Sequence, residues 1–468
     1  MSLPQNLADA SAAELAAAYA QRETNPVEVV EAVLDRIAAW EPKLQALWAA
    51  DAEAARAQAR ESAARWQRGT PLSPLDGVPG TLKENIATKG TAVPLGTAAA
   101  ELVPAAEDAP PAARWREAGL VLLAKTTMPD YGMLSSGLSS FHALARNPWD
   151  TRMTPGGSSA GAGAAAAAGY GPLHVGTDIG GSVRLPAGWC GVVGLKPSAG
   201  RVPIKPPYVG RVAGPMTRTV TDTAWLMQLL SRPDWRDATS LPPAEIAWTA
   251  LDGAVEALRG LRVGLLLDAG WGLAVTAETR ATVQAAARAF EAAGAVVEPM
   301  DPFCTRAMID GLDAFWRMRS WLDISALPDA RREKVLPYIR QWVDAGATLS
   351  AAQVFNGYSQ IHAMRDAAVA ACQPYDLVLS PVSPVPAFPA ELGSPIHDPE
   401  RPFEHIAFTV PYNMSEQPAI SVPAGFTSTG LPIGLQIAGR RHDDLGVLRL
   451  ARTWEQLRPP LRRWPEPA

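Results

Sequence analysis

The sequence contains few cysteines, and none of them is paired at short spacing. Cys190, Cys304 and Cys372 lie far apart along 468 residues. Structural zinc sites and redox dithiols commonly use a C-x-x-C spacing, and small disulfide scaffolds need many more cysteines. We therefore expect no disulfide framework, no metal ion and no other cofactor.

Long apolar runs and an excess of basic charge are also missing. The apolar stretches, such as residues 263–267, are far too short to span a bilayer, and the N-terminus lacks the basic and apolar regions of a secretion signal. The 42 Lys and Arg residues face 47 Asp and Glu, a net charge of -5. No basic field is available to hold nucleic acid. These absences predict a cytoplasmic protein without a membrane or nucleic-acid partner, and they favour a small-molecule or protein substrate.

Helical and strand patterns alternate along a chain that is 47% hydrophobic, enough for a large core. Residues 10–66 have the apolar spacing of two or three helices, and residues 307–372 are mostly helical. Residues 212–230 have the pattern of a loop leading into a helix, and residues 233–243 form the best candidate linker. Short apolar strands are predicted at residues 117–125 (after a helix end), 261–267, 295–300, 375–380, 419–423 and 433–438. The alternation indicates a layered α/β fold.

Two glycine-rich motifs stand close together, and each places a serine directly after a pair of glycines. The first motif, PGGSSAG, contains Ser158 at the expected start of a helix, and the second, GTDIGGSVR, contains Ser182. Glycines allow tight turns in which successive N–H groups point at one oxygen. The second motif therefore predicts that Ser182 is a nucleophile beside an oxyanion hole, built from the backbone N–H groups of Ile179, Gly180, Gly181 and Ser182.

A serine nucleophile needs a base, and histidine is a poor candidate here. None of the six histidines lies in a recognisable catalytic context, and the G-x-S-x-G nucleophile elbow is absent. Lys83 lies in GVPGTLKEN, a Gly/Pro-punctuated stretch that predicts a strand end or loop. Burial there would favour the neutral amine, which can accept a proton.

The run from Gly156 to Val202 resembles the signature of the amidase signature family, and residues 417–439 resemble its closing motif. Members use a serine, a second serine after a cis peptide bond, and a lysine. The resemblance assigns these roles to Ser182, Ser158 and Lys83, whose spacings agree with the family. Glu84 stands where many members have Asp. The resemblance covers nearly the whole chain.

This resemblance implies an amidase signature fold, a mixed central β-sheet covered by helices on both faces, in one domain over residues 1–468. It also implies an amidase, a hydrolase of linear amide carbon–nitrogen bonds, that acts through a Ser182 acyl-enzyme and a Ser158/Lys83 proton relay. The expected substrate is a small-molecule amide, anilides, carbamates and esters are further possible substrates, and a homodimer is implied as well. Within the domain we expect N-terminal helices (1–67), a catalytic core (68–232), a second half with a helical substrate-side segment (233–374), and C-terminal core strands with a closing helix (375–468).

Further residues receive supporting roles. By the same resemblance, Thr177, Asp178 and Arg184 brace the glycine turn without taking part in the chemistry. The loop residues Met133, Leu134 and Ser135 are candidates for lining the acyl pocket, although an apolar loop is as often plain core.

Alternatives remain open from the sequence. Ser159 could replace Ser158, and the turn at residues 178–182 could cradle a phosphate. The chain could also be the glutaminase subunit of a tRNA-dependent amidotransferase, or an inactive scaffold that keeps the fold. A phosphate-binding P-loop pattern is not found there, and the complete set of Ser182, Ser158 and Lys83 argues against a scaffold.

Overall fold

The structure, a computed structural model, describes residues 3–251 and 258–467. Its centre is one mixed sheet in which eleven strands of the described residues follow the order β1-β3-β2-β4-β6-β5-β10-β11-β9-β7-β8. The strand bounds are β1 (Leu47–Trp48), β2 (Pro79–Lys83), β3 (Val121–Thr126), β4 (Leu173–Asp178), β5 (Val193–Lys196), β6 (Val212–Thr217), β7 (Arg262–Leu265), β8 (Val296–Pro299), β9 (Leu377–Pro381), β10 (Ala419–Phe426) and β11 (Pro432–Gly439).

Parallel and antiparallel pairs divide this sheet into regions. β2 runs parallel to β3 and β4 on one side, and β7 runs parallel to β8 and β9 on the other. The central pairs, from β4/β6 through β5 and β10 to β11/β9, are antiparallel. Lys83 at the end of β2 and Asp178 at the end of β4 therefore lie at the same edge of the sheet, because the two strands are parallel.

Helices and short 3-10 turns cover the sheet and extend from it. Their bounds are η1 (Leu7–Asp9), α1 (Ala12–Gln21), α2 (Pro26–Leu44), α3 (Ala52–Arg68), α4 (Pro110–Glu117), η2 (Asp130–Gly132), α5 (Ala160–Ala168), α6 (Arg184–Cys190), α7 (Val220–Leu230), α8 (Ala277–Ala292), α9 (Arg306–Ser325), α10 (Asp329–Arg332), α11 (Pro337–Asp344), η4 (Ala345–Thr348), α12 (Ala351–Cys372), α13 (Val410–Met414) and α14 (Asp444–Leu457). No helix in this described part is long and apolar enough to cross a bilayer.

Local sequence explains where several helices begin. Ser11 and Glu14 form a capping box at the start of α1, and Asn25 caps α2, whose first residue is Pro26. These side chains satisfy N–H groups that have no partner inside the helix, and proline loses nothing at the first helical position. The helices predicted within residues 10–66 are confirmed as α1, α2 and α3.

The two faces of the sheet bury different helices. Strand residues such as Val175 and Ile420 belong to a core shared with α4, α7, α8 and α14. On the opposite face, α5 packs on β4 while α6 packs on β10 and β11. The predicted fold, a mixed sheet with helices on both faces, is confirmed.

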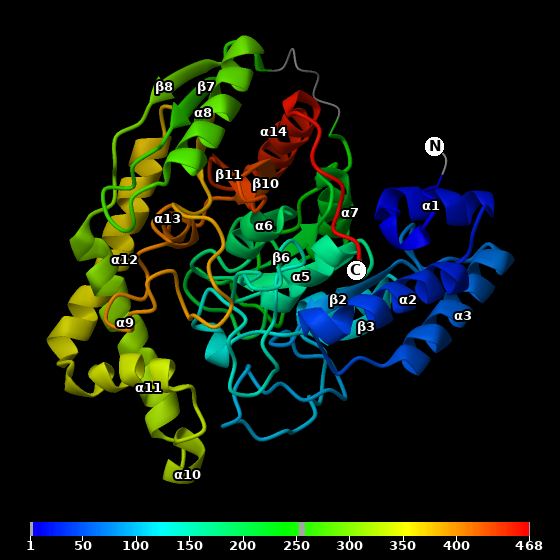
Figure 1. Cartoon of the computed structure of the whole chain (residues 1–468), viewed down its shortest axis with the longest axis horizontal. Helices are drawn as coiled ribbons and strands as arrows, with labels where there is room; N and C mark the ends of the chain where they lie inside the picture. The colour runs from blue at the N-terminus through cyan, green and yellow to red at the C-terminus, as the bar shows by residue number, and fades with distance from the viewer. Residues whose placement is uncertain (1–2, 252–257, 468) are drawn as a thin grey trace.

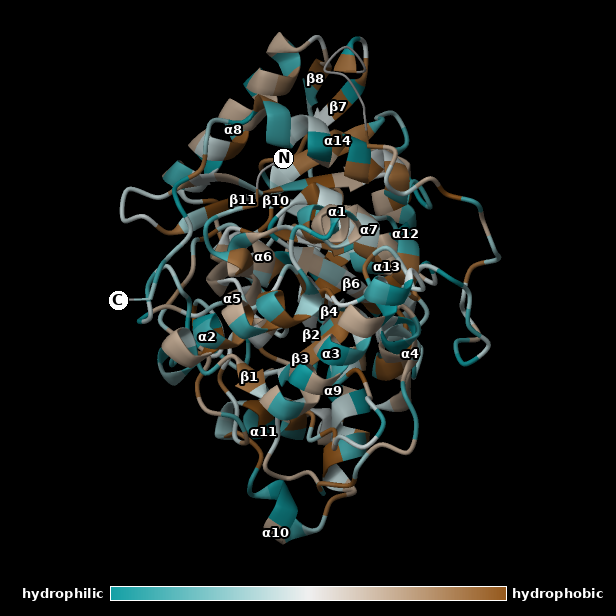
Figure 2. Ribbon diagram, turned by 90° about the vertical axis from the view of Figure 1, so that its right-hand side faces the viewer, coloured by the Kyte–Doolittle hydropathy of each residue, from teal (hydrophilic) through white to brown (hydrophobic). Residues whose placement is uncertain are grey.

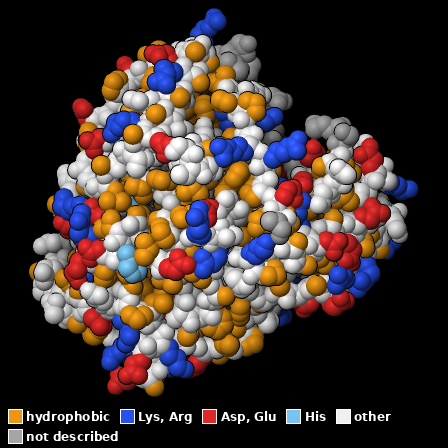
Figure 3. All heavy atoms as spheres, viewed as in Figure 1, with side chains coloured by type: hydrophobic (Ala, Val, Ile, Leu, Met, Phe, Trp, Pro, Cys, Tyr) orange, Lys and Arg blue, Asp and Glu red, His pale blue; other side chains and the backbone are white. Residues whose placement is uncertain are grey.

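A helical segment forms one side of the molecule. Figure 1 shows α9, α11 and α12 along the side opposite the N-terminal helices α1 to α3, with α10 at the lower tip. α10 also projects at the lower end in Figure 2, where it is coloured as hydrophilic. On the face shown in Figure 3, acidic and basic side chains are interspersed among apolar ones.

The six strands predicted at residues 117–125, 261–267, 295–300, 375–380, 419–423 and 433–438 are confirmed, but β1, β4 and β5 were not predicted and one segment was misassigned. Residues 212–217 are not a loop: they form β6, a central strand between β4 and β5. Gly214 and Pro215 gave this segment its loop-like composition. A Cβ at Gly214 would lie 2.0 Å from Leu195 O, so close approach of the neighbouring strand requires glycine there.

Candidate active site

Lys83 ends β2 with a buried side chain. Its Nζ donates hydrogen bonds to Ser158 Oγ at 2.8 Å and to Ser159 Oγ at 3.1 Å. Burial lowers the pKa of Lys83 well below its usual value, and the charge of Arg211 lowers it further, although Asp178 and Glu84 act in the opposite direction. The structure therefore places a lysine that favours its neutral form against two serine hydroxyls.

Two other buried lysines differ from Lys83 in what they contact. Lys125 donates to Ile86 O and to Thr88 Oγ1, and Lys196 donates to Pro197 O. Burial lowers the pKa of each to about 7. Burial alone thus does not set Lys83 apart from the other two lysines, whereas its hydrogen bonds to two serine hydroxyls do.

Ser158 and Ser159 precede α5 and have different surroundings. The peptide bond between Gly157 and Ser158 is cis. Ser159 Oγ donates to Thr177 O at 3.1 Å and accepts from Thr177 N at 3.2 Å, so its hydroxyl is engaged by β4. Ser158 Oγ has Lys83 as its hydrogen-bond partner, leaving Ser158 the freer hydroxyl.

Ser182 lies in the turn between β4 and α6 and is partly exposed. Its carbonyl accepts a 3.2 Å hydrogen bond from Ser159 N, which ties the two serine segments together. Within the described residues, no hydrogen bond joins Ser182 Oγ to Ser158. Within residues 3–251 and 258–467, the turn thus presents a serine hydroxyl that donates to no protein acceptor.

Asp178 shapes this turn from its first residue. Its Oδ1 accepts from Gly181 N at 2.8 Å and its Oδ2 accepts from Val183 N at 3.1 Å. The amides of Ile179, Gly180 and Ser182 donate to no protein acceptor among the described residues. The four amides expected to form an oxyanion hole therefore differ in whether they are free to donate, because the Gly181 amide already donates to Asp178.

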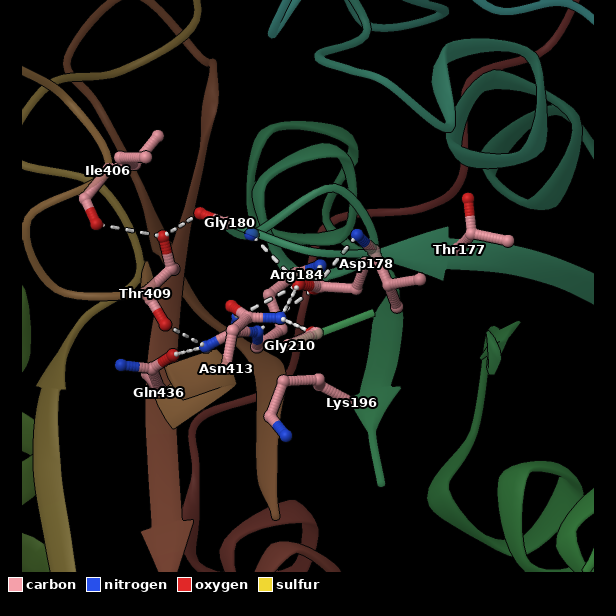
Figure 4. Close-up of polar contacts among 12 residues, drawn as sticks. Thr177, Asp178, Gly180, Arg184, Lys196, Gly210, Ile406, Thr409, Asn413 and Gln436 are labelled. Carbon is pink, nitrogen blue, oxygen red and sulfur yellow. Dashed lines mark hydrogen bonds and ion pairs between the residues drawn. The ribbon is translucent and has the colours of Figure 1, made fainter. Parts of the chain in front are cut away.

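Arg184 closes the network around Asp178 (Figure 4). Its Nη2 lies 3.0 Å from Asp178 Oδ1, and its Nη1 donates to Thr409 O at 2.9 Å and to Gln436 Oε1 at 2.8 Å. Burial would raise the pKa of Asp178, but the charge and hydrogen bonds of Arg184 and the amide of Asn413 hold it below its usual range. A paired, fully hydrogen-bonded buried charge fixes the geometry of the turn.

Thr409 and Asn413 hold the turn from the C-terminal half. Thr409 Oγ1 donates to Gly180 O at 2.6 Å. Asn413 Nδ2 donates to Asp178 Oδ1 at 2.8 Å and to Gly210 O at 3.0 Å. The sequence did not indicate Thr409 or Asn413, and it included Gln436 only within the closing motif at residues 417–439, because nothing in their local pattern points to a turn so far away along the chain. Thr177, by contrast, contacts Asn85 through its hydroxyl.

An apolar wall lies over Gly180. A Cβ added there would lie 3.2 Å from Ile406 Cδ1 and 3.5 Å from Trp316 Cη2. Trp316 belongs to α9, the helix that the sequence placed in the substrate-side segment. Space above the turn is therefore bounded by two apolar side chains that the motifs did not identify.

The loop with Met133, Leu134 and Ser135 borders the other serine. Leu134 is buried, while Met133 and Ser135 are partly exposed. A Cβ at Gly157 would lie 2.7 Å from Leu134 O, so this loop packs directly against the residue before Ser158. Its contact with a substrate stays a prediction.

Glu84 follows Lys83 in the sequence, but its side chain contacts other residues than Ser158 and Ser159. Its carboxylate accepts from Gly96 N at 3.0 Å and pairs with His142 Nε2, and both side chains are buried. Glu84 therefore anchors the loop that follows β2, whereas Lys83 forms the hydrogen bonds to Ser158 and Ser159.

Comparison with known proteins gives a consistent set of similarities. A family model described as Amidase matches residues 28–448. The chain is 36% identical to a glutamyl-tRNA(Gln) amidotransferase subunit of Myxococcus xanthus (strain DK1622), covering 96% of this chain and 97% of that protein. It is 33% identical to an acylamidase of Rhodococcus erythropolis, with 97% of each covered. A bacterial aryl acylamidase of the amidase signature enzymes superposes with a TM-score of 0.87 at 29% identity, with 96% of each chain covered.

Proposed function

The chain belongs to the amidase signature family, hydrolases that act on carbon–nitrogen bonds, and from this premise we propose that it hydrolyses an acyl amide through an acyl-enzyme on Ser182. The observation that carries the proposal is the 2.8 Å hydrogen bond from Lys83 Nζ to Ser158 Oγ, beside the turn that presents Ser182. Anilides, carbamates and esters share the required acyl carbon and are further substrates of the same chemistry.

The proton relay begins at Ser182. Its hydroxyl loses a proton to Ser158 as Ser182 Oγ attacks the acyl carbon, and Ser158 passes its own proton to neutral Lys83. A serine hydroxyl donates and accepts at once, so Ser158 can serve as the link. The relay then returns a proton to the departing amine, and water hydrolyses the acyl-enzyme. Ser158 fits this role better than Ser159, whose hydroxyl already bonds both backbone groups of Thr177.

The oxyanion of the tetrahedral intermediate would lie in the turn after β4. The amides of Ile179, Gly180 and Ser182 are the donors without a protein acceptor among the described residues, and Gly181 would contribute only by sharing its hydrogen with Asp178. Asp178 and Arg184 hold these donors in place before substrate arrives, and such preorganisation is where most electrostatic stabilisation of a transition state originates.

The experiment that tests this proposal combines labelling and hydrolysis. A fluorophosphonate probe is expected to modify Ser182, located by peptide mass, and to leave the Ser182→Ala variant unmodified. A panel of 4-nitroanilides, carbamates and 4-nitrophenyl esters then gives kcat/KM for the same preparations. A folded wild-type chain that is neither labelled nor active on any member of the panel would contradict the proposal and favour an inactive scaffold.

A second candidate function follows from the 36% identity to the amidotransferase subunit of Myxococcus xanthus. In that case glutamine would be the amide, and the released ammonia would be used by partner subunits. Ammonia release from glutamine, measured with the chain alone and with added partner subunits, separates the two. Glutamine hydrolysis that requires the partners would favour this candidate over a self-contained amidase.

A further inference from the structure

Arg211 is a partly buried arginine without an anionic partner among the described residues. The four buried arginines of the described residues each form an ion pair with an aspartate: Arg36, Arg184, Arg201 and Arg317. The one side-chain hydrogen bond of Arg211 runs from Nη1 to Pro206 O at 3.3 Å, and no ion pair of the described residues includes it. Withdrawing a guanidinium from water without a counter-charge costs free energy, so an anionic partner would stabilise Arg211.

The backbone places Arg211 beside the candidate active site. In the β4/β6 ladder, Val212 pairs with Asp178, so Arg211 stands next to the glycine turn where β4 ends. The preceding residue, Gly210, accepts a hydrogen bond from Asn413, whose amide also donates to Asp178 (Figure 4). The charge of Arg211 also acts on Lys83, as the lowered pKa of that lysine indicates.

A second arginine lies in the same region. The guanidinium of Arg319 lies 4.1 Å from the centroid of the Tyr208 ring, in the segment that leads to Arg211. Arg319 is exposed, and it forms no ion pair among those of the described residues. Trp316, one turn before Arg319 on the same helix, is one of the two side chains that cover Gly180.

The positive charges of Arg211 and Arg319 repel each other as long as no anion is bound between them. Burial, together with the charge of Arg319, lowers the pKa of Arg211 to about 10. A planar anion that accepts two parallel N–H bonds matches the guanidinium fork and cancels the repulsion, and a carboxylate has this geometry.

We propose that Arg211, assisted by Arg319, binds a carboxylate carried by the substrate. The inference rests on the proposed amidase function and deepens it: the substrate is an amide with an apolar part against Trp316 and Ile406 and an anionic group at Arg211. The carboxylate belongs either to the acyl part or to the amine part, and the test has an arm for each.

The experiment compares matched charged and neutral amides. The acyl arm uses succinyl-4-nitroanilide against butyryl-4-nitroanilide, and the amine arm uses N-butyryl-4-aminobenzoate against N-butyryl-4-aminobenzamide. The measured quantity is the ratio of kcat/KM, charged over neutral. In one arm this ratio is expected to exceed one in the wild type and to fall about 10- to 100-fold in Arg211→Gln, the usual worth of a hydrogen bond to a charged group. Arg211→Lys is expected to recover part of it, because it keeps the charge but loses the fork.

Two further variants control the result. Arg319→Gln is expected to lower the same ratio by a smaller factor, and since that side chain is exposed, the readout does not depend on a folding defect at Arg211. Arg262→Gln removes an arginine of β7, toward the far end of the sheet, and is expected to leave the ratio unchanged. A wild-type ratio at or below one in both arms, or a ratio unaffected by Arg211→Gln, overturns the carboxylate site. Turnover of the neutral amides in that event leaves the amidase proposal standing, whereas loss of all turnover and labelling removes both.

Discussion

Lys83 Nζ lies 2.8 Å from Ser158 Oγ, and both side chains are buried at the edge of the sheet where β2 and β4 end. Burial disfavours the charged form of the lysine, so the amine that contacts Ser158 favours its neutral form. The contact links two segments that are 75 positions apart in the sequence.

Replacement of Lys83 tests the relay. In Lys83→Met we expect kcat/KM for a 4-nitroanilide to fall about 10²- to 10⁴-fold, the usual contribution of general acid–base catalysis, and to fall less for a 4-nitrophenyl ester. An amine is the poorer leaving group and depends more on the returned proton. Lys125→Met is the matched control, because it removes another buried lysine, one that bonds to Ile86 O and Thr88 Oγ1 and to neither Ser158 nor Ser159. An unchanged amide-to-ester ratio in Lys83→Met would show that Lys83 is not the base.

The pH profile carries a second prediction. In the proposed relay the base is neutral Lys83, so kcat/KM for a neutral amide is expected to rise with pH as the lysine loses its proton. Because the pKa of Lys83 is lowered well below its usual value, the plateau is reached well below pH 10.5. Removal of the Arg211 charge raises the pKa of Lys83, so the acid limb of Arg211→Gln moves to higher pH. A limb that stays in place, or moves to lower pH, would show that Arg211 does not act on the base.

The ion pair in the glycine turn is expected to stabilise the fold. Arg184→Met leaves Asp178 as an uncompensated buried charge, which costs about 3–5 kcal/mol of unfolding free energy. Chemical denaturation measures this loss. The double variant Arg184→Met/Asp178→Asn is expected to be less destabilised than Arg184→Met, because the unpaired carboxylate is gone. Equal destabilisation of the two variants would mean that packing, and not charge, dominates at Arg184.

The wall over Gly180 predicts a change in acyl selectivity. A methyl group in Gly180→Ala would press on Ile406 Cδ1 and approach Trp316 Cη2. We expect kcat/KM to fall about 10-fold or more for a phenylpropionyl anilide relative to an acetyl anilide, the scale for one methyl group in a tight pocket. Ile406→Val removes the crowded methyl, so the double variant should recover the larger substrate. Parallel losses for both acyl groups would place the acyl part elsewhere.

The sequence predicted the serines and Lys83 because their glycine-rich surroundings impose a recognisable local pattern. It did not predict the residues that complete the site. Thr409, Asn413 and Gln436 contact the turn and its arginine through individual hydrogen bonds, and no local periodicity marks such contacts. Trp316 lies in a segment that the sequence predicted only to be helical and on the substrate side.

The error at β6 has a similar origin. Composition suggested a loop because Gly214 and Pro215 are weak strand formers, yet the central strand requires glycine where β5 approaches. Arg211 was missed for a different reason. It follows a loop and precedes a misassigned strand, so its position beside the glycine turn became visible only through the pairing of Val212 with Asp178.

The hydrogen bond from Arg184 to Gln436 spans 252 positions of the chain. Synthesis on the ribosome proceeds from the N-terminus, so the serines and Lys83 emerge long before the residues that complete the turn. Until then, Arg184 lacks its contacts to Thr409, Asn413 and Gln436, and the glycine turn lacks its anchors. We therefore expect nascent chains that end before β11 to be catalytically silent.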